Sequence, residues 1–137
     1  MAVPKRFDEL IDAEDLRRRL TALTAEGADG GNPAVRTKAL GILKEARLEA
    51  RGRIQDMLMA DKRGVLCAER LSFVQDELIR VIYDFAVTHV YPVKNPSSAE
   101  RMSVAAVGGY GRATLAPGSD IDLLFILPYK QTPWGES

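Results

Sequence analysis

The sequence predicts an α+β fold in which a helical N-terminal region is followed by the start of a β-sheet. Apolar residues recur at three- and four-residue spacing through much of residues 12–90, which is typical of amphipathic helices. Two short apolar segments, at residues 102–107 and 121–127, have the length of strands. A segment with two prolines at residues 91–98 separates these regions. We therefore expect a helical region over residues 1–98 and a second domain that begins at residue 99 and continues to residue 137.

Three helices are expected in the first region. The first spans about residues 12–25, with Asp12 as its N-cap, and a glycine-rich segment ends it. The second begins at Asn32-Pro33 and ends near residue 61, because Asn caps helices well and Pro is best tolerated at the first helical position. The third spans about residues 68–90, where its apolar positions follow a helical period. These helices are expected to pack together.

The two strands have different surroundings in this prediction. The first, at residues 102–107, ends at Gly108-Gly109. The second, at residues 121–127, starts beside acidic residues and ends in the apolar run Leu123–Leu127, so we expect its far end to be buried. Such an apolar strand needs further neighbours to cover it, and an isolated pair of strands is marginally stable. We therefore expect the sheet to continue in a longer protein.

Composition excludes several classes of protein. The chain has 137 residues, 46% hydrophobic and 28% charged, so it is neither a disordered tail nor a membrane protein. Nineteen basic residues balance nineteen acidic ones, so no strong field favours a nucleic acid or an anionic membrane as partner. No apolar run reaches the ~18 residues of a membrane span, and no apolar signal segment follows Met1–Arg6. We expect a cytoplasmic protein.

The lone cysteine and the lone histidine are both interpreted as structural. Cys67 cannot form an internal disulfide and is expected to be a small core residue. His89 lies near the apolar face of the third helix, where packing is a better explanation than metal binding or base catalysis. Neither residue is therefore a candidate for chemistry.

The acidic pair Asp120 and Asp122 is the main candidate for chemistry. Side chains alternate along a strand, so the two carboxylates are expected on one side, about 7 Å apart along the backbone. A divalent cation between them removes their repulsion. Oxygen ligands suit Mg²⁺, which often binds one or two carboxylates together with substrate phosphates. The alternative is a pair of solvated turn residues after Pro117-Gly118-Ser119.

Glycines close to these acids indicate a phosphate site. Gly108 and Gly109 lack a Cβ, so their N–H groups can approach phosphate oxygens closely. Arg112 and Ser119 are candidate phosphate donors, although a structural salt bridge is an equal alternative for Arg112. Tyr110 is expected to pack. The dinucleotide-binding and P-loop glycine motifs do not fit this segment.

The whole segment resembles a known family. A hydrophobic residue, Gly108-Gly109, ten residues, and then Asp120-Ile121-Asp122-Leu123 is similar to the signature of the DNA polymerase beta-type nucleotidyltransferases. Within that superfamily, Gly-Gly-Tyr-Gly-Arg followed by Leu-Ala-Pro-Gly-Ser-Asp-Ile-Asp-Leu-Leu resembles the bifunctional PII uridylyltransferase/uridylyl-removing enzymes. The resemblance is sharp over residues 104–127 and only general over the helices. It implies the start of a nucleotidyltransferase-type mixed sheet, here incomplete.

The resemblance also implies an activity. In that family UMP is transferred from UTP to a tyrosine of the PII nitrogen-signalling protein, and pyrophosphate is released. Asp120 and Asp122 would hold Mg²⁺, Gly108 and Gly109 would face the UTP triphosphate, and Ser119 would steady the turn or a phosphate. A separate histidine–aspartate metal domain removes UMP by hydrolysis, and C-terminal domains sense glutamine as a regulator.

Two departures from the family pattern affect this interpretation. Ala113 stands where the family usually has Gly, which would strain or shift the turn. The superfamily also needs a third carboxylate from a later strand, and the sequence ends at Ser137 before one appears. The chain alone is therefore expected to have little activity and poor solubility.

Two alternatives remain open. One is a related nucleotidyltransferase, such as a glutamine synthetase adenylyltransferase or a drug-modifying enzyme. The other is a noncatalytic interaction module. The Gly-Gly-Tyr-Gly-Arg form and the helices before it favour uridylyl transfer over the first alternative.

Overall fold

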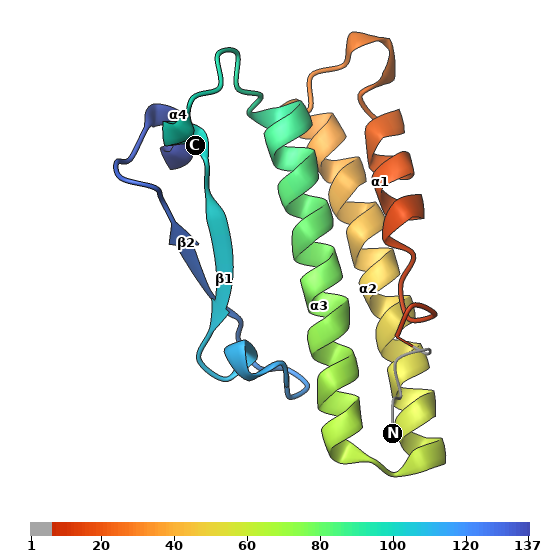
Figure 1. The fold of residues 1–137 in the computed structure, drawn as a ribbon. Helices are drawn as coiled ribbons and strands as arrows, with labels where there is room; N and C mark the ends of the chain where they lie inside the picture. The colour runs from red at the N-terminus through yellow and green to blue at the C-terminus, as the bar shows by residue number, and fades with distance from the viewer. Residues whose placement is uncertain (1–6) are drawn as a thin grey trace.

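A computed structural model describes residues 7–137 as three long helices beside a two-stranded antiparallel sheet (Figure 1). The α+β prediction is confirmed. The long helices are α1 (Ala13–Ala22), α2 (Pro33–Asp61) and α3 (Gly64–Phe85), the strands are β1 (Ser103–Val107) and β2 (Asp122–Ile126), and a short helix α4 (Pro133–Glu136) follows. The segment Met1–Arg6, used in the argument against a secretory signal, lies outside the described residues.

Helix capping sets where the first two helices begin. The Asp12 carboxylate accepts a hydrogen bond from the Asp15 N–H at 2.9 Å, and the Asn32 side chain accepts one from the Ala34 N–H at 2.8 Å. Pro33 occupies the first position of α2, as predicted, and α2 ends at Asp61. The following residue, Lys62, has φ 56° and closes the helix through its N–H to the Leu58 carbonyl.

The other helix boundaries differ from prediction. α1 ends at Ala22 rather than near residue 25, because the chain turns into a short 3₁₀ segment (Ala25–Gly27) that contains Glu26 at φ 64°. α3 begins at Gly64 rather than near residue 68, so that its first turns already contribute Leu66 and Cys67 to the interior. Beyond Phe85 the helix continues as one π-helical turn (Ala86–Val90).

The core lies between the three long helices. All three pairs of these helices contact one another, and each contributes fully buried side chains. The innermost are Leu20, Ile54 and Val81, together with Leu10 from the segment before α1. Cys67 is buried in this core, as predicted. No helix in the described part of the chain is both long and apolar enough to cross a membrane.

His89 has the structural role expected of it. Its ring lies 5.3 Å from the Phe85 ring between centroids, and its Nδ1 is 3.2 Å from the Thr24 hydroxyl. Gly30 approaches its backbone so closely that a Cβ would lie 2.4 Å from the His89 carbonyl oxygen. These contacts join the end of the third helix to the loop between α1 and α2.

The sheet lies beside α3, on the side away from α1 (Figure 1). Strands β1 and β2 pair antiparallel with Val104 opposite Phe125 and Val107 opposite Asp122. The expectation that the far end of β2 is buried is wrong for this chain, since Leu124 and Phe125 are 51% and 57% exposed. The apolar run has only β1 as a neighbour, and one strand cannot cover both of its faces.

The connection between the strands is held against α3 at two points. The Tyr110 hydroxyl, on a 3₁₀ turn (Tyr110–Arg112), donates to the Asp76 carboxylate. The Leu115 N–H donates to the Ala68 carbonyl at 3.0 Å. Tyr110 is only 3% exposed, which confirms the prediction that it packs. These two contacts hold the connecting segment against α3, and this segment leads to the acidic pair.

Candidate nucleotidyl-transfer site

Gly108 and Asp122 form the most tightly fitted part of the candidate site. Because β1 ends at Val107 opposite Asp122, the turn after β1 lies beside that carboxylate. Gly108 has φ 62°, a conformation that side chains other than hydrogen strongly disfavour. A Cβ on Gly108 would lie 2.8 Å from Asp122 Oδ2. The glycine is therefore required both by the backbone and by the close approach of the carboxylate.

Gly109 differs from its neighbour. Its φ is −59°, an ordinary helical value, and a Cβ there would meet only Arg112 Nη2 at 3.6 Å. Nothing in the fold of the described residues requires glycine at this position. A glycine that the backbone does not need is consistent with close approach of a ligand.

A tight turn places the residues just before β2. Pro117 and Gly118 occupy its central positions, Gly118 has φ 76°, and the Ser119 N–H donates to the Ala116 carbonyl at 3.1 Å, as in a type II turn. The turn expected from Pro-Gly-Ser is therefore present. It leads directly to Asp120, so the acid lies on a segment fixed at both ends.

The prediction that Asp120 and Asp122 share one face of a strand is only partly right. β2 begins at Asp122, so Asp120 and Ile121 precede the strand and strand alternation does not position Asp120. The reason is that β1 ends at Val107, opposite Asp122, and offers no partner beyond it. Both carboxylates are exposed. Among residues 7–137, no group of three or more His, Cys, Asp or Glu side chains is placed to hold a metal ion.

Arg112, Ser119 and Asp120 line one cavity of about 310 Å³ together with Gly109 and Tyr110. We call it the glycine-turn cavity. Arg112 makes no ion pair with any residue that the structure describes, so the structural salt bridge considered for it has no support here. Four of the six residues predicted for the phosphates and the metal thus line one space, while the other two, Gly108 and Asp122, lie against each other outside it.

Ala113 adopts the conformation that its position in the motif suggests. Its φ is 58°, in the left-handed region, and its N–H closes the 3₁₀ turn on the Tyr110 carbonyl at 3.1 Å. Left-handed backbone costs an L-residue with a Cβ about 1–2 kcal/mol. The turn therefore keeps the backbone that glycine would adopt freely and carries this strain.

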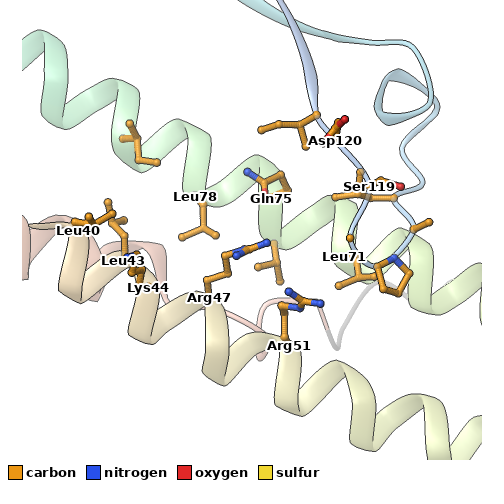
Figure 2. Close-up of a pocket in the computed structure, with 17 residues that line it drawn as sticks. Leu40, Leu43, Lys44, Arg47, Arg51, Leu71, Gln75, Leu78, Ser119 and Asp120 are labelled. Atoms are coloured by element: carbon orange, nitrogen blue, oxygen red, sulfur yellow. The ribbon is translucent and has the colours of Figure 1, made fainter.

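Sequence reasoning missed a second set of residues near Asp120. A groove of about 460 Å³ lies between α2, α3 and the segment Leu115–Ile121, and three basic side chains of α2 line it (Figure 2). They are Lys44, Arg47 and Arg51. Their spacing of three and four residues places them on one helix face, which was the signal available in the sequence. Such spacing also occurs on any solvated helix face, so the sequence does not distinguish this row from ordinary surface charge.

Comparison with known proteins identifies relatives that share one name. Over 133 residues, 97% of its length, the chain is 50% identical to the bifunctional uridylyltransferase/uridylyl-removing enzyme of Bradyrhizobium sp. strain BTAi1. The enzyme of the same name from Bradyrhizobium diazoefficiens is also 50% identical, over 132 residues. This chain is homologous to one segment of these enzymes. The resemblance predicted from the motif is thereby confirmed.

The match covers nearly all of this chain but only a small part of each relative. The chain spans 14% of the length of each of these relatives. No protein-family model matches it, and no solved structure matches it. The relatives are named for the transfer and removal of uridylyl groups.

Proposed function

We propose that this chain supplies the metal-binding and phosphate-binding start of a uridylyltransferase that moves UMP from UTP to a tyrosine of the PII signalling protein and releases pyrophosphate. The observation that carries the proposal is the close approach of Asp122 to Gly108, beside a cavity lined by Asp120. A Cβ added to Gly108 would lie only 2.8 Å from Asp122 Oδ2. This arrangement occurs in a chain that is 50% identical to enzymes named for uridylyl transfer. The fuller enzyme would provide the remaining carboxylate.

The chemistry of the donor set suits Mg²⁺. Asp120 and Asp122 offer only carboxylate oxygens and are exposed, and Mg²⁺ is commonly bound by one or two carboxylates with substrate phosphates completing its shell. When bound, the ion would neutralise charge on the reacting phosphate. Asp122 is already held in place by its approach to Gly108 and by its pairing opposite Val107.

The residues around the glycine-turn cavity would orient the triphosphate. Gly109 leaves its side of the cavity open to a phosphate, and the Arg112 guanidinium can donate two parallel hydrogen bonds to phosphate oxygens. Ser119 adds a hydroxyl next to Asp120. Holding the triphosphate still beside the carboxylates is the main contribution a protein makes to phosphoryl and nucleotidyl transfer.

Removal of UMP and control by glutamine are further parts of the proposal. The relatives' name includes uridylyl removal. We propose that the longer enzyme also hydrolyses the modified PII protein, with glutamine as regulator, through regions other than the one described here.

The decisive experiment changes each acid in the full-length enzyme. Asp120→Asn and Asp122→Asn should each lower UMP transfer from UTP to PII by about 1000-fold, since a metal ion at the reacting phosphate supplies several kcal/mol. Asp56→Asn is the matched control, because Asp56 is an exposed acid on α2 that makes no ion pair within the described residues. It should leave the rate unchanged.

Two outcomes would contradict the proposal. An Asp120→Asn enzyme that is folded and still transfers UMP at the normal rate in Mg²⁺ would remove the metal assignment. Use of ATP in preference to UTP by the unaltered enzyme would instead favour a related adenylyltransferase.

A further inference from the structure

The groove beside Asp120 combines apolar walls with a row of cations (Figure 2). Its apolar side chains come from α2, α3 and the segment Leu115–Ile121, and two of them, Leu40 on α2 and Ile82 on α3, are 51% and 46% exposed. The segment Leu115–Ile121 closes one end of the groove. Exposed apolar side chains in a concave surface are typical of a site that another molecule covers.

The three cations of the groove have no ion-pair partners among the described residues. Other basic side chains of α2 and α3 are paired, among them Arg53 with Glu49 at 3.7 Å, and Arg80 with Glu77 at 2.6 Å. Lys44, Arg47 and Arg51 make no such contact with any residue in the range 7–137, and Arg51 is half-buried.

The local charge of the groove is therefore positive. Its lining holds three basic side chains and one acidic side chain, Asp120, which leaves a net charge of +2. The whole chain, by contrast, is neutral. The groove therefore complements a ligand that carries carboxylates.

The groove and the glycine-turn cavity share four lining residues: Leu115, Ala116, Ser119 and Asp120. The glycine-turn cavity has the open glycine and the guanidinium that a triphosphate needs, whereas the groove is mainly apolar with its cations along one wall. In an in-line transfer the attacking group and the leaving group lie on opposite sides of the phosphorus. The two spaces therefore suit two different substrates that meet at Asp120.

We infer that the groove between α2, α3 and Leu115–Ile121 docks the protein acceptor, through a segment of that acceptor that carries acidic and apolar side chains. This inference rests on the proposed function, because it assigns the second substrate of the same site. The cations of α2 pair with carboxylates of the acceptor segment, and Leu40 and Ile82 cover its apolar side chains. Docking there brings an acceptor hydroxyl to the end of the groove where Asp120 lies.

The first test reverses the charge of the row in the full-length enzyme. The triple variant Lys44→Glu, Arg47→Glu, Arg51→Glu should raise the KM for the acceptor protein by roughly 3- to 100-fold, since each exposed ion pair contributes roughly 1.5- to 5-fold to affinity. The KM for UTP should stay the same, and kcat at saturating acceptor should stay within about twofold. The effect should shrink as salt is added, because salt screens exposed charges.

Matched controls separate the groove from general charge. Arg18→Glu, Lys38→Glu and Lys62→Glu make the same change of net charge at exposed positions that do not line the groove, and this triple variant should leave the acceptor KM unchanged. Leu40→Ser with Ile82→Ser tests the apolar wall and should raise the acceptor KM by an amount that does not depend on salt. If the triple variant fails to fold, the neutral variant Arg47→Gln, a mild change at an exposed site, should raise the acceptor KM by roughly 1.5- to 5-fold.

The outcomes distinguish this inference from the proposed function. An unaltered enzyme that transfers no UMP to any protein contradicts the proposed function. An unaltered enzyme that does so, with an acceptor KM that is the same in the groove and control variants, overturns the groove assignment alone. A rise in the KM for UTP with no change for the acceptor would show that the groove holds the nucleotide instead.

Discussion

Replacing Gly108 with alanine tests the link between the glycine turn and the acid beside it. Alanine at φ 62° costs about 1–2 kcal/mol relative to glycine. The new methyl would also lie 2.8 Å from Asp122 Oδ2, so the carboxylate must move from its place, and an off-rotamer side chain costs about 0.5–1.5 kcal/mol. Alanine also restricts the unfolded chain more than glycine does, which offsets about 0.4–1 kcal/mol of this destabilisation. We expect Gly108→Ala to lower the free energy of unfolding by about 0.5–3 kcal/mol.

The neighbouring glycine is the matched control. Gly109→Ala introduces the same methyl at φ −59°, where the nearest atom would be Arg112 Nη2 at 3.6 Å. This backbone suits alanine, so the variant should be as stable as the parent or more stable by about 0.4–1 kcal/mol. It should nevertheless weaken UTP binding if phosphates approach this backbone.

Urea unfolding of the 137-residue chain measures both effects. Trp134 is the only tryptophan and follows the sheet, so its fluorescence reports this region, while circular dichroism reports the helices. With a slope of about 1–3 kcal/mol per molar urea, the Gly108→Ala midpoint should fall by about 1 M. Equal midpoints for the Gly108 and Gly109 variants would refute the argument from backbone conformation and close approach.

Two further predictions concern the turn and its attachment to α3. Ala113→Gly should raise the free energy of unfolding by up to about 1 kcal/mol, because glycine adopts φ 58° without strain; a less stable variant in urea unfolding would contradict this. Tyr110→Phe should lower stability by about 1–3 kcal/mol, since it leaves the Asp76 carboxylate without its donor. Burial, with the Asp76 hydrogen bond, raises the pKa of Tyr110 above its ordinary value near 10. Its stabilising effect is therefore present below about pH 10 and is lost as the pH rises above that value. The phenylalanine variant should lose less stability than the parent between pH 9 and 11, measured by thermal unfolding; parallel pH curves would contradict the assignment.

The sequence by itself determined the helical region, the strand pair and the motif. Capping residues and apolar spacing act within a few residues of chain, which is why α2 was placed correctly from Asn32-Pro33 to Asp61. The spacing of Gly108-Gly109 and the acidic pair was enough to predict the relationship to uridylyltransferases that the comparisons confirm. Those signals are local, so they survive without knowledge of the fold.

Only the tertiary structure decided which residues share a space. Strand pairing, not sequence alternation, placed Asp122 in the sheet and left Asp120 before it, because β1 ends at Val107. The packing of α3 against the connection between the strands brought the basic face of α2 to the acidic segment, although Arg47 and Asp120 are far apart in the sequence. Contacts of this kind depend on how separate elements pack, and no periodicity within one element encodes them.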